Sequence, residues 1–191
     1  INNCSEKFNI FATMTRKLIL SSPLLEITIS RLCQELIENQ IDGTETVILG
    51  LQPRGIFFAE RIAAELSKHL ENPPALGKID ATFYRDDFRR GDPLSPNSTE
   101  IPFLVENKRV ILVDDVLATG RMVRAAMDAL NAFGRPAKVE LCVLIDRIYS
   151  RDLPIHPDYV GKSVNTLTTE KVLVEWTEQG HDADKIWLIT Q

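Results

Sequence analysis

The chain has 191 residues, a formal net charge of −5 and a hydrophobic content of 44%. These values suffice for one α/β domain with a substantial core, and the acidic balance gives no support for a generally basic, nucleic-acid-binding surface. The three cysteines are widely spaced, so we expect neither a disulfide framework nor a paired-cysteine metal site. No apolar stretch approaches the roughly 20 residues that span a bilayer, and we expect a cytoplasmic protein without a membrane partner.

The first residues differ in character from the rest of the chain. Residues 1–13 are polar, lack periodicity and do not resemble a signal peptide. A regular pattern begins directly after Met14. We therefore expect residues 1–13 to be an N-terminal extension and residues 14–191 to form a single domain.

Apolar residues recur either at helical spacing or in short runs. In chain order they predict a helix over 24–37, a strand over 47–51, a helix over 56–70, strands over 79–84 and 110–113, a helix over 121–133, and strands over 139–145, 171–176 and 186–189. The polar stretch 85–100 predicts a long mobile loop. Apolar strands that alternate with helices predict a mainly parallel sheet covered on both faces. The helix over 121–133 is expected to bury Val123, Ala126, Met127, Leu130 and Phe133.

Two carboxylates follow the strand at 110–113. Asp114 and Asp115 stand where we expect that strand to end, and the small-residue loop 118–121 then opens a helix. A helix start binds anions through its unpaired N–H groups and its dipole, and carboxylates accept hydrogen bonds from sugar hydroxyls. This arrangement predicts a ribose 5-phosphate site. Neighbouring strand residues point to opposite faces, so both carboxylates can serve one sugar only if the strand ends there.

A second loop, residues 52–55, also lies between a buried strand and a helix. Ligands of open α/β sheets bind at the carboxyl ends of the strands. Alone, Pro53-Arg54-Gly55 is consistent with a plain turn. Together with the loop at 118–121 it predicts two anion sites, one for each end of a diphosphorylated sugar.

The run Val110–Arg124 resembles the phosphoribosyl pyrophosphate (PRPP) motif of type I phosphoribosyltransferases. That resemblance implies a twisted, mainly parallel sheet flanked by helices, with a small hood formed by the N- and C-terminal segments. Further segments, Tyr84–Asp87, Gly134–Pro136, Leu153–Lys162 and Glu170–Val172, are similar to the PyrR family, pyrimidine-operon regulators that are also uracil phosphoribosyltransferases. The likeness extends from about residue 24 to 176.

The resemblance implies the conversion of uracil and PRPP to UMP and pyrophosphate, with Mg²⁺ carried by PRPP. Asp114, Asp115 and Arg85 are then the expected catalytic residues, and the two aspartates are also candidate magnesium contacts. The 5-phosphate would be held by Ala118, Thr119, Gly120, Arg121 and Met122. Pyrophosphate would be held by Pro53, Arg54, Gly55 and Arg85, and the base pocket would include Ile145, Asp146 and Arg147. The family resemblance also implies a homodimer or higher homo-oligomer.

The chain departs from the family at basic positions. Gln34, Asn39 and His156 stand where the regulators carry basic side chains, and the segment Asp146–Arg151 is altered and one residue longer. Arg31 and Lys162 remain as candidate RNA contacts. Since each lost phosphate contact weakens RNA binding, we expect binding to a pyrimidine-operon leader RNA to be weak or absent.

Three alternatives remain at this stage. The chain could be an RNA-binding regulator that keeps the nucleotide site only as a sensor, and a basic face would favour that function. It could be a phosphoribosyltransferase for a purine or orotate. It could also be a plain structural domain, in which Asp114–Asp115 and Thr119–Gly120 are surface turns.

Overall fold

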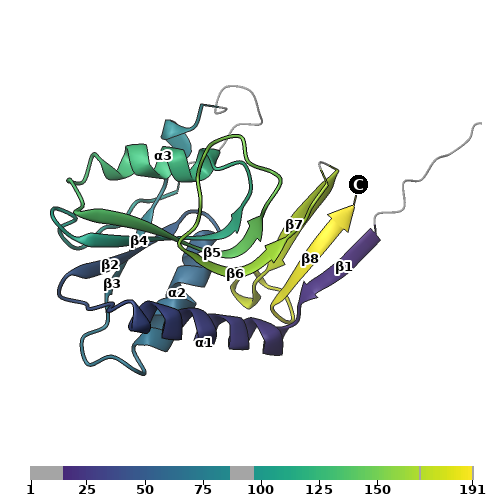
Figure 1. Ribbon diagram of the computed structural model, residues 1–191, viewed down its shortest axis with the longest axis horizontal. Helices are drawn as coiled ribbons and strands as arrows, with labels where there is room; N and C mark the ends of the chain where they lie inside the picture. Colours follow the sequence, from purple (N-terminus) through teal and green to yellow (C-terminus); the bar gives the residue numbers. More distant parts are fainter. Residues whose placement is uncertain (1–14, 87–96, 168, 191) are drawn as a thin grey trace, which may run out of the picture.

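Figure 1 shows the computed structural model, which describes residues 15–86, 97–167 and 169–190. Its elements are β1 (Thr15–Leu20), α1 (Ser22–Glu38), β2 (Thr46–Leu51), α2 (Gly55–Leu66), β3 (Ala75–Ile79), η1 (Thr82–Tyr84), β4 (Arg109–Leu117), α3 (Arg121–Leu130), β5 (Lys138–Arg147), β6 (Tyr159–Val164), β7 (Glu170–Glu175), η2 (Thr177–Gln179) and β8 (Lys185–Thr190). Residues 1–13, expected to be an extension, lie outside the described residues. None of the described helices is long and apolar enough to cross a membrane.

The main sheet has five parallel strands in the order β3-β2-β4-β5-β6. Every residue of β2 is buried, as expected for a parallel strand covered on both faces. One core cluster joins α1 and α2 to one face of the sheet, and a second joins α3 to the other face (Figure 1). The predicted α/β architecture, a mainly parallel sheet flanked by helices, is confirmed.

A second, smaller sheet forms the expected hood. It is antiparallel, in the order β1-β8-β7, so strands from the two ends of the described chain lie side by side (Figure 1). Trp176, which follows β7, is fully buried in the core cluster shared with α1 and α2.

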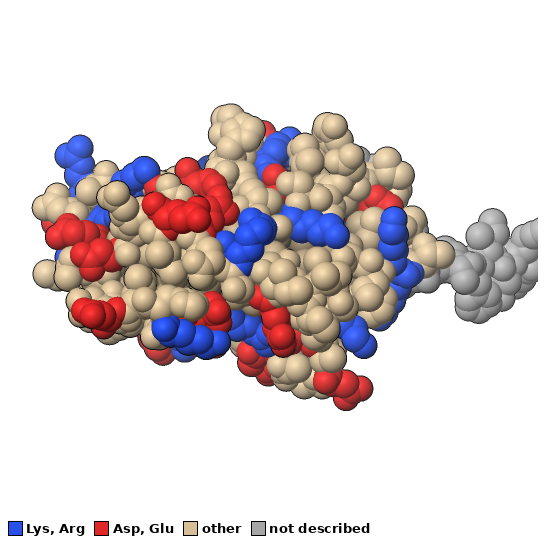
Figure 2. All heavy atoms as spheres, turned by 60° about the horizontal axis from the view of Figure 1, so that its bottom comes forward, with Lys and Arg blue, Asp and Glu red and all other residues tan. Residues whose placement is uncertain are grey.

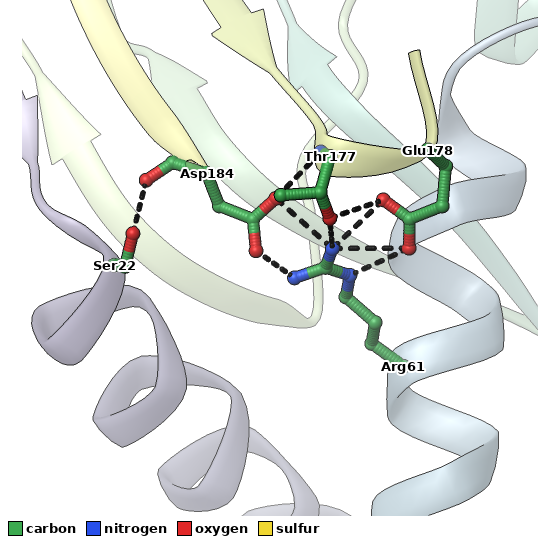
Figure 3. Close-up of polar contacts among 5 residues, drawn as sticks. All are labelled: Ser22, Arg61, Thr177, Glu178 and Asp184. Carbon is green, nitrogen blue, oxygen red and sulfur yellow. Dashed lines mark hydrogen bonds and ion pairs between the residues drawn. The ribbon is translucent and has the colours of Figure 1, made fainter. Parts of the chain in front are cut away.

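Arg61 of α2 ties the hood to the main body. Its guanidinium contacts Thr177, Glu178 and Asp184 (Figure 3). Its carbon atom Cζ also lies 4.6 Å from the centre of the Trp176 ring. Ser22, at the start of α1, adds a hydrogen bond to the backbone carbonyl of Asp184, at 2.8 Å.

Several predicted boundaries were wrong. The strand expected over 79–84 is β3, Ala75–Ile79, which begins directly after the two prolines and pairs with β2. The strand expected over 110–113 continues to Leu117, and the helices end earlier than predicted, α2 at Leu66 and α3 at Leu130. Strands β1 and β6 were not predicted. Most of the predicted mobile loop, residues 87–96, lies outside the described residues.

The buried face of α3 is narrower than predicted. Val123, Ala126 and Leu130 are buried, whereas Met127 and Phe133 are exposed by 37% and 45%. Phe133 lies beyond the end of the helix, so the helical spacing on which the prediction depended no longer applies to it.

Candidate active site

The two adjacent carboxylates lie inside β4 rather than after its end. Strict alternation would turn Asp114 and Asp115 to opposite faces. The alternation is broken here, because Val116 packs against the same core cluster as Val113, whereas Leu117 belongs to the cluster on the α3 side. The regular alternation of side chains between the two faces of the sheet is therefore interrupted within β4, although the strand continues to Leu117.

Both carboxylates are buried, with Asp114 exposed by 8% and Asp115 by 6%. Oδ1 of Asp114 accepts a hydrogen bond from the backbone N–H of Asp115 at 2.9 Å, and Oδ2 of Asp115 is buried without a hydrogen-bond partner among the described residues. Burial, reinforced by the charge of Asp115, raises the pKa of Asp114 well above its usual value. Burial also raises the pKa of Asp115, against the opposing charge of Arg54. Such perturbed groups cluster at functional sites, and their burial contradicts the alternative of a solvated surface turn.

This burial predicts a trade between stability and function. Asp114→Asn should raise the free energy of unfolding of the ligand-free, magnesium-free protein at neutral pH, by roughly 1–2 kcal/mol. A carboxyl group whose pKa is raised in the folded state favours the folded protein most at acidic pH. For Asp114 this contribution to stability falls as the pH rises above 3.8, the usual pKa of an aspartate, and through the raised pKa of the folded state. Urea unfolding at pH 5 and pH 7.5 tests this. The advantage of the variant should be larger at the higher pH, and an equal difference at both would contradict the expectation.

The loop predicted to hold pyrophosphate packs directly against β4. Its Gln52–Pro53 peptide bond is cis. A Cβ atom at Gly55 would lie 2.7 Å from the carbonyl oxygen of Val113 and 2.9 Å from Cα of Asp114, so only glycine fits. The charge of Arg54 acts on both aspartates. The structure thus brings the predicted pyrophosphate loop and the predicted catalytic carboxylates together at the start of α2.

The loop predicted to hold the 5-phosphate connects β4 to α3. Gly120 caps the helix with φ +85°, a left-handed conformation that favours glycine, and Ile155 lies 3.2 Å from the place of a Cβ atom there. The backbone N–H of Arg121 donates to Oγ1 of Thr119 at 3.3 Å. Met122, in the first turn of α3, is half-buried and packs against the core cluster that contains the buried residues of this helix.

Two acidic side chains already surround the guanidinium of Arg121. Its Nη1 pairs with Asp86, and its Nε pairs with Asp152 at 3.0 Å. Arg124, one turn later, donates to the backbone carbonyl of Tyr84 at 3.0 Å. These contacts place the segment that carries Arg85 beside α3, next to the predicted 5-phosphate loop.

The predicted base-pocket residues end β5 and have three different environments. Ile145 is fully buried in the core cluster. Asp146 forms an ion pair with Arg151. Arg147 donates from Nε to Oγ1 of Thr166 at 3.0 Å, and from Nη2 to the carbonyl oxygen of Glu170 at 2.7 Å. Ile145 therefore presents no side-chain surface to a ligand.

A cavity of about 350 Å³ lies between the loop predicted to hold the 5-phosphate and the end of β5. It is lined by Ala118, Thr119, Arg147, Tyr149, Ser150, Arg151, Asp152 and Thr166. Ala118, Thr119 and Arg147 were predicted to belong to the site, whereas the hydroxyl groups of Tyr149, Ser150 and Thr166 were not. For Tyr149 and Ser150 the segment between β5 and β6 was a signal, and for Thr166 the segment after β6, because each follows the carboxyl end of a parallel strand.

The two candidate RNA contacts bind the protein itself. Nη2 of Arg31 donates to the carbonyl oxygens of Val160 and Gly161 at 2.8 and 2.7 Å, and Nζ of Lys162 donates to that of Ile19 at 3.2 Å. Figure 2 shows one face of the molecule, on which basic and acidic side chains are interspersed. On that face the described residues form no continuous basic surface.

Magnesium has a limited set of ligands here. Among the described residues, no group of three His, Cys, Asp or Glu side chains could hold a metal ion. Two adjacent carboxylates, one with an unpartnered oxygen, fit an ion that also binds substrate oxygens and water, as Mg²⁺ does in phosphate-binding sites.

Known proteins are similar to this chain in sequence and in fold. A family model for the phosphoribosyl transferase domain matches residues 16–179. A relative named Bifunctional protein PyrR, from Enterococcus faecalis, is 40% identical over 175 residues, which are 92% of this chain and 97% of the relative. One from Bacillus subtilis is 40% identical over 166 residues, covering 85% and 91%. A solved hypoxanthine phosphoribosyltransferase from Staphylococcus aureus has a TM-score of 0.68 at 17% identity, covering 89% of this chain and 90% of its own, and supports the fold alone.

Proposed function

Because the chain belongs to the PyrR family of phosphoribosyltransferases, we propose that it transfers the phosphoribosyl group of PRPP to uracil, giving UMP and pyrophosphate. The observation that carries this proposal is the buried pair Asp114–Asp115 between two loops that each open a helix. Two anion sites flanking carboxylates suit a sugar with a phosphate at one end and a diphosphate at the other. We also propose that this reaction takes place in the cytoplasm.

The proposed reaction forms a bond between a uracil ring nitrogen and C1 of the ribose, while the bond from C1 to the diphosphate oxygen breaks. Pyrophosphate leaves with the electron pair, and the ring nitrogen loses its proton. Loop 118–122 would hold the 5-phosphate at the start of α3, and Arg54 would hold the diphosphate at the start of α2. These fixed contacts orient the two ends of the sugar.

Asp114 and Asp115 would accept hydrogen bonds from the ribose hydroxyls and offset the positive charge that develops on the ring. Mg²⁺ brought by PRPP would have these same carboxylates as its nearest protein ligands, and it would supply charge that stabilises the leaving pyrophosphate. Arg85, whose neighbours Tyr84 and Asp86 contact α3, would supply a further cation to bound PRPP.

A base-competition assay tests this function. The chain is incubated with PRPP and Mg²⁺ and with uracil, hypoxanthine, guanine or orotate in turn, and the nucleotide is quantified. We expect UMP from uracil, little product from the other bases, and none when the metal is chelated. A preference for hypoxanthine or orotate would instead support the alternative of a different phosphoribosyltransferase.

The second candidate function is RNA-dependent regulation, which the bifunctional name of the relatives favours. Two observations count against it in this chain. Arg31 and Lys162 are bonded to backbone carbonyls of the chain itself, and Gln34, Asn39 and His156 lack the charge expected at those positions.

Binding to RNA should therefore be weak at physiological salt. Filter binding to the leader RNA of the chain's own pyrimidine operon, with and without UMP, measures it. Nanomolar, sequence-specific binding that UMP strengthens would contradict the prediction. Sedimentation velocity on the same samples would test the homodimer or larger oligomer that the family implies.

A further inference from the structure

Arg151 connects the phosphate loop to the end of β5. Its side chain is only 15% exposed. Nη1 donates to the carbonyl oxygens of Leu117 and Ala118, at 3.2 and 2.5 Å, and to that of Arg147 at 3.1 Å. Nε donates to the carbonyl oxygen of Ile155 at 3.0 Å. One guanidinium thus binds four backbone carbonyls from three segments.

The next carbonyl of the loop is held from the same side. The oxygen of Thr119 accepts the backbone N–H groups of Asp152 and Leu153, at 3.0 and 3.2 Å. Three consecutive carbonyls, those of residues 117, 118 and 119, are therefore bonded to residues 151–153. Such a continuous set of contacts fixes the orientation of the loop's peptide groups.

Peptide orientation matters at an anion site, because a carbonyl oxygen that faced a phosphate would repel it, whereas an N–H group attracts it. We propose that Arg151 is a positioning residue for the ribose 5-phosphate site: it binds the carbonyls of the loop and so leaves N–H groups at the start of α3 for the phosphate. This inference rests on the proposed function and deepens it.

Arg151 acts here through the loop rather than as a free charge. Its Nη2 pairs with Asp146, so the positive charge is largely neutralised within the protein. Its five donor contacts use the planar fork of a guanidinium, which an ammonium group cannot reproduce. Asp146, which was predicted to line the base pocket, instead holds Arg151 through this ion pair.

Binding measurements with two fragments of PRPP separate this role from a general structural one. Isothermal titration with ribose 5-phosphate should show affinity weakened by about tenfold or more in Arg151→Gln, with a smaller loss in Arg151→Lys. Inorganic pyrophosphate should bind within about twofold of the wild type, because its predicted loop at Gly55 does not contact Arg151. In steady state, KM for PRPP should rise more than kcat falls.

Matched variants keep the test decisive. Arg135→Gln makes the same exchange at an exposed position in the turn between α3 and β5, and it should leave both affinities unchanged. Asp146→Asn combined with Arg151→Gln removes the ion pair without leaving a buried charge, and it substitutes for the single variant if that fails to fold.

Each outcome supports or overturns the inference. Selective loss of ribose 5-phosphate affinity supports it, whereas unchanged affinity, or equal weakening for both ligands, overturns the positioning role alone. If the wild-type chain binds neither ligand, the proposed function fails and this inference fails with it.

Discussion

Asp115→Asn should lower turnover by about 10- to 100-fold without unfolding the protein. The variant loses one charge-assisted contact to the reacting sugar, and such a contact contributes about 1.5–3 kcal/mol. Its loss should affect the fold little, because Oδ2 has no partner within the described protein. Initial rates of UMP formation, with circular dichroism to check the fold, measure the effect.

Asp128→Asn is the matched control. Asp128 is exposed on α3 and, among the described residues, pairs with Arg124 one turn away, so this variant should keep wild-type kinetics. A folded Asp115→Asn protein with unchanged turnover would remove the central residue from the proposed mechanism.

Arg61→Ala should produce the largest loss of stability, about 2–4 kcal/mol in the free energy of unfolding. The substitution leaves Asp184, whose side chain is 15% exposed, without its cationic partner (Figure 3). It also removes the guanidinium from the face of the Trp176 ring. Because Arg61 and Glu178 are partly exposed, the loss of stability should be smaller than for a fully buried ion pair. Urea unfolding followed by tryptophan fluorescence reports it directly.

The same pair predicts a pH dependence. Burial alone would raise the pKa of Asp184, but its hydrogen bonds to Arg61 lower it below the usual 3.8. The pair therefore contributes its full stabilisation of the folded protein at pH values above 3.8. That contribution is lost as the pH falls through the lowered pKa of Asp184 in the folded state. The difference between wild type and Arg61→Ala should shrink below about pH 4.

Lys68→Ala provides the comparison, since the exposed Lys68, just beyond the end of α2, pairs with the half-buried Glu65 in its last turn. Exposed pairs contribute about 0–1 kcal/mol. Equal losses in the two variants would show that Arg61 does not hold the hood.

The sequence predicted the parts of the fold that have strong local signals. Continuous apolar runs identified β2, β4 and β5, and helical spacing identified α1, α2 and α3. Strand β6 has exposed and half-buried positions, so its sequence lacks an apolar run, and β1 gains its strand pairing only from β8 at the far end of the chain. Pairing between distant segments leaves no local pattern to detect.

The site was predicted from residue types, and its geometry was not. Asp114 and Asp115 were expected to share a ligand because β4 would end there, whereas the strand continues and the alternation breaks instead. Arg151 was noted only as part of an altered segment. Its role depends on four carbonyl oxygens contributed by residues up to 34 positions away, and backbone acceptors carry no sequence signature.

The pairing of β1 with β8 also constrains the order in which the chain can fold during synthesis. Thr15 lies opposite Thr190, so the first described strand leaves the ribosome long before its partner exists. Until residues 185–190 have been made, β1 has an unpaired edge that could pair with other chains. The five-stranded sheet can assemble from segments that are already available, whereas the hood must close last.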